Sequence, residues 1–119
     1  MELDYRVRTT GPRSEITVLD IEGGIFISNH AKFREMMDNF VYNKTRVLIL
    51  NCVKLDFIGS SGIGTIMFTY DRMKKQDAEM VLAGVSGEVR QVFDRLGLSQ
   101  HVPMYDTEQE AVNELLSGA

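Results

Sequence analysis

The residues best suited to bind or react with a ligand form a short run of glycines and serines between two apolar stretches. This run is Gly59-Ser60-Ser61-Gly62-Ile63-Gly64, and it follows an apolar segment and precedes an amphipathic one. Small residues let the backbone turn sharply into a helix, and a helix start leaves N–H groups that favour an anion. The pattern therefore indicates a place where an anionic group can be held.

Two common motifs with similar residues are excluded. The run is not a phosphate-binding P-loop, because no lysine followed by serine or threonine completes it. It is not the nucleophile elbow of a hydrolase either, because Gly59-Ser60-Ser61-Gly62-Ile63 lacks the closing glycine of that motif. No acid/base pair or activated nucleophile can be assembled, so we do not expect an enzyme. From the residues alone, Ser60 acting as a helix cap is the favoured interpretation.

A few other residues carry chemical groups that need an interpretation. Phe26 is either a core residue or an exposed anchor for a binding partner. Cys52 follows an apolar strand and is expected to be a buried small hydrophobe, and His30 is expected to be solvated. His30 and His101 are the only histidines, and neither has a partner at metal-ligand spacing. We therefore predict no metal and no cofactor.

Composition limits the class of protein. The chain has 119 residues, of which 44% are hydrophobic and 25% charged, with a net charge of −4. These values are typical of one soluble domain, here residues 1–119, and argue against a nucleic-acid binder. A single cysteine excludes an internal disulfide, no apolar run approaches the ~20 residues of a membrane span, and the first residues do not resemble a signal peptide. We expect a cytoplasmic protein.

Strand and helix patterns alternate along the chain. Alternating or continuous apolar residues predict strands, and apolar residues at helical spacing predict amphipathic helices between them. Gly23-Gly24 is expected to interrupt the second strand, and Thr107 with Glu110 has the spacing of a capping box. The predicted strands are Leu3–Val7, Ile16–Ile21, Val47–Leu50, Glu79–Ala83 and Val102–Tyr105, and the predicted helices contain Phe33–Val41, Ile63–Met73, Val89–Leu96 and Ala111–Leu116. The order ββαβαβαβα predicts a single α/β domain with a mixed, mostly parallel sheet and helical cover.

The glycine-serine run and its place in this order resemble the STAS domain, and more narrowly the bacterial anti-sigma factor antagonists. The later segments Val81–Ser86, Val92-Phe93 and Leu96-Gly97-Leu98 extend the resemblance over nearly the whole chain. In that family an Asp-Ser-Ser/Thr-Gly-Leu-Gly element opens a helix. Its first serine is phosphorylated by a partner-switching kinase that is itself the anti-sigma factor. Ser60 occupies that position.

The resemblance implies a signalling module that binds a GHKL-type serine kinase or anti-sigma factor and is switched by phosphorylation. Ser60 is the implied acceptor, and Ser61 is the alternative. The residues expected to contact the partner are Gly24, Phe26, Gly59, Ser61, Gly62 and Ile63.

The chain also departs from the family pattern. Four positions that are usually acidic are neutral here, namely Gly24, Phe26, Asn51 and Gly59, and we expect all four at the same end of the sheet. Two alternatives therefore stay open. One is a STAS scaffold subunit without phosphorylation, as in a stressosome-like or transporter-associated assembly. The other is a small-ligand domain that binds an anion or nucleotide at Ser60–Gly64.

Overall fold

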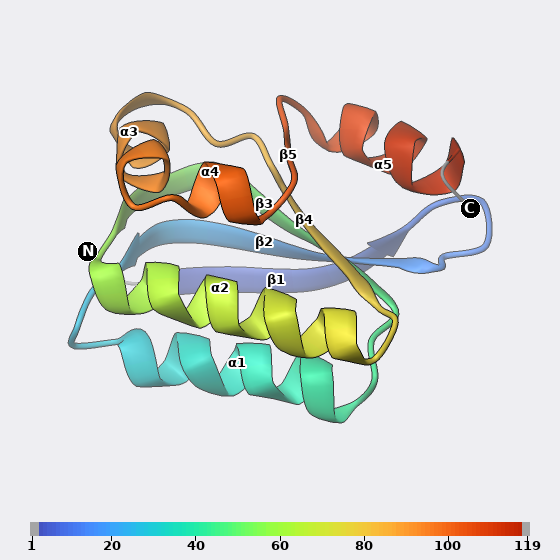
Figure 1. Cartoon of the computed structure of the whole chain (residues 1–119), viewed down its shortest axis with the longest axis horizontal. Helices are drawn as coiled ribbons and strands as arrows, with labels where there is room; N and C mark the ends of the chain where they lie inside the picture. Colours follow the sequence, from blue (N-terminus) through green and yellow to red (C-terminus); the bar gives the residue numbers. More distant parts are fainter. Residues whose placement is uncertain (1–2, 118–119) are drawn as a thin grey trace.

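A computed structural model describes residues 3–117, and Figure 1 shows a twisted sheet with helices along it. The elements in chain order are β1 (Leu3–Thr10), β2 (Ile16–Ile25), α1 (His30–Tyr42), β3 (Val47–Ile58), α2 (Ser60–Lys75), β4 (Glu79–Ala83), α3 (Gly87–Arg95), α4 (Leu98–His101), β5 (Met104–Tyr105) and α5 (Glu108–Ser117).

The five strands form one sheet in the order β1-β2-β3-β4-β5. β1 pairs with β2 in antiparallel register across a short turn, and every later pair is parallel. Parallel neighbours need a crossover connection, which the helices provide. β4 is buried over nearly its whole length because its residues contribute to the cores on both faces of the sheet, whereas β1 at the edge is mostly exposed. The predicted fold class and the mixed, mostly parallel sheet are confirmed.

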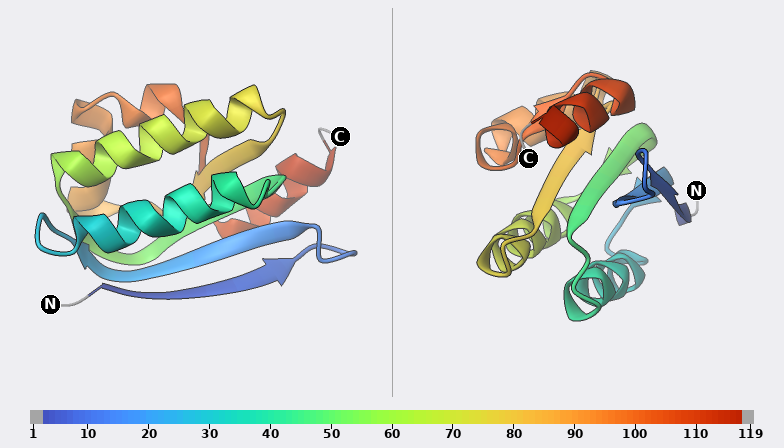
Figure 2. Two further views of the ribbon diagram at one scale, coloured as in Figure 1. Left: turned by 90° about the horizontal axis from the view of Figure 1, so that it is seen from below. Right: turned by 90° about the vertical axis from the view of Figure 1, so that its right-hand side faces the viewer.

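The sheet has two unequal faces. One face packs against apolar residues of α1, α2, α3 and α4, in a large core that contains Phe33, Ile66 and Phe93. The opposite face has a smaller core in which Ala111 and Val112 of α5 meet apolar residues of β2, β3 and β4. Figure 2 shows α1 and α2 side by side along the larger face. Beyond α5, this second face of β1, β2 and β3 carries mostly polar side chains.

The structure corrects several predicted boundaries. β2 does not stop at Gly23-Gly24, because both glycines pair with β3 and two register shifts absorb the irregularity. β3 likewise continues to Ile58, so β2 and β3 stay paired up to the glycine-serine run. The short helix α4 was not predicted, and the last strand has only two residues. A four-residue helix offers too little periodicity to be recognised from sequence.

The predicted helix ends differ in their outcome. The capping box is confirmed, since the hydroxyl of Thr107 accepts a hydrogen bond from the backbone N–H of Glu110 at 3.1 Å. Gly97 has the left-handed conformation in which a glycine commonly follows the end of a helix, here α3. Asn29 and Ser86 occupy N-cap positions but make no side-chain capping bond. Within residues 3–117 no helix is both long and apolar enough to cross a membrane.

Candidate functional site

The carboxyl ends of two neighbouring parallel strands meet where α2 begins. Ile25 of β2 pairs with Ile58 of β3, and the backbone N–H of Gly59 donates to the carbonyl of Ile25 at 3.0 Å. The loop that follows β2 and the start of α2 therefore leave the sheet side by side. This arrangement brings residues 24–29 next to residues 57–63, although they are about thirty positions apart in the sequence.

Ser60 and Ser61 lie on the surface of the first turn of α2. The N-cap residue is Gly59, in an extended conformation, and no side chain makes a capping bond there. The interpretation of Ser60 as the helix cap is therefore wrong. Both serine side chains are exposed, so their hydroxyl groups are free for another interaction.

Three residues of the predicted contact set are buried instead, namely Gly24, Gly62 and Ile63. A Cβ atom at Gly62 would lie 2.7 Å from Cγ1 of Ile58 and 3.0 Å from Cγ2 of Ile25. Glycine therefore lets α2 begin directly against the ends of β2 and β3. Ile63 is also buried and belongs to the larger core. Gly62 and Ile63 therefore support the start of α2 from the core side, and neither presents a side chain to a partner.

Phe26 and Phe57 stack on each other at the ends of β2 and β3. Their ring centroids are 4.8 Å apart and the ring planes differ by 12°. Phe57 is 46% exposed and Phe26 is half-buried, so Phe26 is neither a core residue nor a fully exposed anchor. A Cβ atom at Gly24 would lie 2.4 Å from the Phe26 ring, so the ring occupies the space that a side chain at position 24 would take. Gly24 itself is buried.

Asn29 holds the loop in which Phe26 sits. Its side-chain oxygen accepts a hydrogen bond from the backbone N–H of Phe26 at 2.8 Å, and its Nδ2 donates to the carbonyl of Gly24 at 3.0 Å. The next residue, Ile27, is 93% exposed. Asn29 is the N-cap residue of α1, but its side chain bonds the preceding turn and not the helix. An asparagine just after an apolar triplet is also a signal for a side chain that hydrogen-bonds its own turn.

A groove of about 370 Å³ runs between α1 and α2 beside Ser61. His30 is not simply solvated, because its Nε2 lies 2.8 Å from the hydroxyl oxygen of Thr65 and so joins the two helices. Further along the groove, Arg72 pairs with Asp38 at 2.7 Å. The two helices that flank the serines are thus tied together by polar contacts on their exposed side.

Asn51 lies away from this site, which corrects the expectation that all four neutral positions cluster. Asn51 pairs with Asp20 and Ala83 in the middle of the sheet, six residues before Phe57. At about 3.3 Å per strand residue, that separation is roughly 20 Å. Only Gly24, Phe26 and Gly59 come together. The sequence could not show this because β3 continues well past the point where its pairing with β4 ends.

The amide of Asn51 belongs to a charged network on the second face. Its Nδ2 donates to Asp20 at 2.7 Å, and Asp20 also accepts from Arg8 at 2.7 Å. Arg8 reaches Glu108 at the start of α5 as well. The hydrogen bond from Arg8 is the main reason that the pKa of Asp20 is lowered from 3.8 to about 2, against the opposing effect of burial. The network joins β1, β2, β3 and α5.

The remaining candidates have structural roles. Cys52 is buried as predicted, and burial raises the pKa of its thiol to about 12. His101 lies 2.8 Å from Asp71 and packs edge-on against Tyr70. In the described part of the chain no group of three or more histidine, cysteine or acidic residues is arranged to hold a metal ion.

Comparison with known proteins places this geometry in context. The STAS domain family matches residues 9–111. An anti-sigma F factor antagonist from Paenibacillus polymyxa is 34% identical over 68 residues, which cover 57% of this chain and 58% of that relative. The aligned segment thus spans less than two thirds of the relative.

Solved structures show the same fold. The phosphorylated form of the Bacillus cell fate determinant SpoIIAA superposes with a TM-score of 0.69 at 22% identity, covering 94% of this chain and 99% of that one. A sulfate transporter family protein from Wolinella succinogenes superposes with a TM-score of 0.73 at 18% identity, covering 88% and 89% of the two chains. At these identities the likeness shows the fold alone.

Proposed function

Because the chain belongs to the STAS domain family, we propose that it is an anti-sigma factor antagonist-like module, bound by a GHKL-type serine kinase or anti-sigma factor and switched by phosphorylation of Ser60. The observation that carries the proposal is the exposed hydroxyl group of Ser60 at the start of α2, where no side chain caps the helix. It lies beside exposed apolar side chains at the ends of β2 and β3. Ser61 is the alternative acceptor.

The position of Ser60 suits a phosphate. Phosphorylation adds a charge of about −1.5 to −2 and three acceptor oxygens. At a helix N-terminus these oxygens meet backbone N–H groups and a favourable dipole, so the fold should tolerate the modification. The likeness in fold to a SpoIIAA structure in its phosphorylated form supports this choice.

The surface around Ser60 defines the partner that it would accept. We call Phe26, Ile27, Phe57 and the two serines the docking patch. Phe26 and Gly59 stand at two of the positions where the family usually carries acids. The patch is therefore uncharged and, apart from the two serines, apolar. A partner would cover it with apolar side chains, and a phosphate introduced there would be desolvated without a compensating charge. Such a charge at an interface costs several kcal/mol, which is enough to abolish micromolar binding.

The direct test is modification in vitro. The protein and its Ser60→Ala variant are incubated with ATP and a GHKL-type kinase from the same genome, and phosphate is located by mass spectrometry. We expect one phosphate on the wild type and none on the variant. Equal phosphorylation of the variant would move the assignment to Ser61 or elsewhere, and no phosphorylation of either protein would contradict the switch.

Binding to the same kinase tests the consequence of the switch. Ser60→Asp should keep the fold but weaken partner binding at least tenfold, whereas Ser60→Ala should bind like the wild type. Ser117→Asp, at an exposed position at the end of α5, is the matched control and should bind the kinase like the wild type. Calorimetry reports affinity, and thermal unfolding reports whether each variant is folded. Unchanged binding by Ser60→Asp would contradict the proposed mechanism.

The likeness in fold to a sulfate transporter family protein favours a second candidate, a STAS scaffold subunit that is not phosphorylated. In that case the docking patch would be covered permanently within a larger assembly. Light scattering of the protein purified from its native cell separates the two functions, because a switched antagonist exchanges partners and a scaffold does not. Calorimetry with nucleotides and small anions tests the alternative in which Ser60–Gly64 binds a ligand. The absence of any heat of binding would contradict it. Both proposed functions are non-enzymatic and belong in the cytoplasm.

A further inference from the structure

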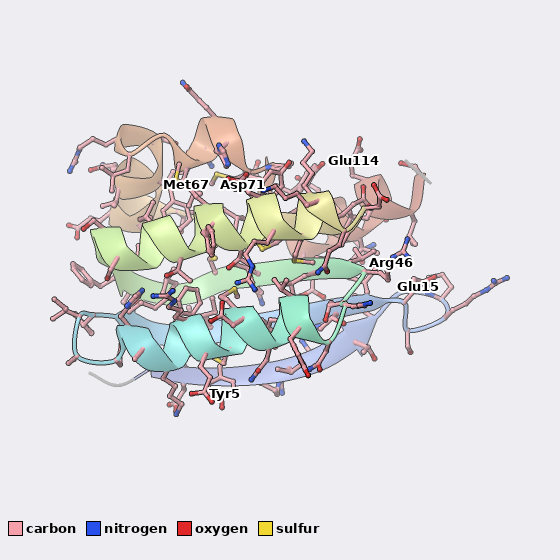
Figure 3. The ribbon with its side chains drawn as sticks, turned by 60° about the horizontal axis from the view of Figure 1, so that its bottom comes forward. Tyr5, Glu15, Arg46, Met67, Asp71 and Glu114 are labelled. Carbon is pink, nitrogen blue, oxygen red and sulfur yellow. The ribbon has the colours of Figure 1, made fainter. Side chains whose placement is uncertain are left out.

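The outer edge of the sheet is formed by β1, which has a strand on only one side. β2 pairs along all eight residues of β1, and in the described part of the chain no element covers the other side. Alternate residues of an edge strand direct unpaired N–H and C=O groups outward, which makes the edge a template for another strand. Figure 3 shows Tyr5 at this edge, beyond α1.

The side chains of this edge are partly apolar. On the face shared with α1, Tyr5 is 44% exposed and Val7 is 51% exposed. The ammonium group of Lys32 lies 5.2 Å from the centre of the Tyr5 ring and covers it from the α1 side. The opposite face of β1 carries Asp4 and Arg6, both exposed. Asp4 forms no ion pair with a residue in the range 3–117.

The charges of β1 are complementary to those of the same strand in reverse. If two copies pair in antiparallel fashion about an axis through Tyr5, Asp4 lies opposite Arg6 of the second copy, and Arg6 lies opposite its Asp4. The same register sets Tyr5 against Tyr5 and Leu3 against Val7. Opposite charges and aromatic pairs directly across an antiparallel ladder are stabilising.

The neighbouring registers are less favourable. An axis through Arg6 pairs Asp4 with Arg8 but brings the two copies of Arg6 together. An axis through Val7 places Arg6 opposite Arg8 twice. Like charges directly opposite each other are destabilising, so the charge pattern selects the register centred on Tyr5.

We propose that β1 pairs with β1 of a second copy in this register and joins two sheets into one of ten strands. The pairing surface is separate from the docking patch, which lies at the ends of β2 and β3. A dimer of this kind would present two copies of Ser60 to partners at the same time. The proposal does not depend on phosphorylation of either serine.

Charge exchange tests the register. Asp4→Arg gives Arg opposite Arg, and Arg6→Asp gives Asp opposite Asp, so each variant alone should dimerise roughly tenfold more weakly than the wild type. A mixture of the two variants restores opposite charges at both positions and should recover the dimer as a heterodimer. Light scattering and sedimentation over a range of concentrations measure the masses. Glu35→Arg and Arg13→Asp make the same charge changes away from β1 and should dimerise like the wild type.

Because Arg6→Asp also removes the ion pair between Arg6 and Asp20, a cross-link provides an independent measurement. Tyr5→Cys places a thiol at the axis, and we expect intermolecular cross-linking by oxidation or a short bifunctional thiol reagent. Tyr42→Cys, at an exposed position at the end of α1, is the control and should cross-link far less. Cys52 is buried and does not compete. A wild type that stays monomeric at every concentration, a mixture that fails to restore the dimer, or equal cross-linking of both cysteine variants would overturn the proposal.

Discussion

Asn29 shows how one side chain prepares a surface for binding. Its two hydrogen bonds hold the backbone of Gly24 and Phe26 in a tight turn, and this turn sets the Phe26 ring over Gly24 and against Phe57. The apolar part of the docking patch is therefore organised before any partner arrives. A preorganised surface loses less conformational freedom on binding than a mobile loop would.

Removal of this side chain should affect both stability and binding. Asn29→Ala loses two hydrogen bonds to a partly buried backbone, so we expect the free energy of unfolding to fall by about 1–3 kcal/mol. Partner affinity should fall as well, because Phe26 is no longer held. Denaturant unfolding and calorimetry measure the two effects. Asn39→Ala, an exposed position on α1, should change neither by more than about 0.5 kcal/mol.

The thiol of Cys52 should be inert in the native protein. Burial raises its pKa to about 12, and only the thiolate reacts with common thiol reagents. At pH 8 we expect no labelling of the native protein beyond the rate of unfolding, and complete labelling in denaturant. Rapid stoichiometric labelling under native conditions, followed by mass spectrometry, would be inconsistent with the buried position.

At the scale of elements, the start of α2 depends on how closely it approaches the two strand ends. Gly62 has no room for a Cβ atom, whereas a Cβ atom at Gly64 would meet nothing within 4 Å. The two glycines of one short motif thus have different structural roles. Gly62 permits packing, and Gly64 leaves the groove beside Ser61 open.

The pair of glycines provides a matched experiment. Gly62→Ala should destabilise the protein by about 1–3 kcal/mol, because Ile58 and Ile25 must shift to make room. Gly64→Ala should be neutral or stabilise it by up to about 1 kcal/mol, because alanine is the better helix former. Urea unfolding of both variants measures the difference. Equal effects would mean that α2 does not rest on the ends of β2 and β3 as described.

At the scale of the whole molecule, the network of Arg8, Asp20, Asn51 and Glu108 connects one end of the chain to the other. Arg8 joins the edge strand β1 to α5, a hundred residues later. The helix α5 is the element that covers the smaller core on the second face, so this ion pair helps to hold that cover in place. The network is partly exposed, and its contribution should therefore be modest and sensitive to salt.

The lowered pKa of Asp20 makes stability depend on pH. Because its pKa is about 2 in the folded state and 3.8 otherwise, the stabilisation is complete above about pH 4 and is lost as the pH falls through 2. Asp20→Asn should therefore reduce the free energy of unfolding at pH 7 by about 1–2 kcal/mol, allowing for solvent screening. The difference from the wild type should shrink as the pH approaches 2. Urea unfolding across pH 2–7 checks this, with Asp56→Asn, at an exposed position of β3, as the matched control.

The order of elements could be read from the sequence because helix and strand patterns depend on residues only a few positions apart. The spacing around Phe33, the apolar run at Val47–Leu50 and the turn at Gly97 each carry their own local signal. The glycine-serine run marked the start of α2 in the same way. Irregular paired strands carry no such signal, and so the continuation of β2 through Gly23-Gly24 was missed.

The composition of the site was decided by the tertiary structure. The sequence marked Ser60 and Phe26 as candidates. Only the pairing between β2 and β3 stacks Phe26 on Phe57 and sets the start of α2 so that Ser60 is exposed and does not cap the helix. The same pairing buries Gly62 and Ile63 and separates Asn51 from the other neutral positions. Each of these outcomes depends on contacts between segments about thirty residues apart. Local periodicity does not encode such contacts, because they are set by strand register and by packing in the core.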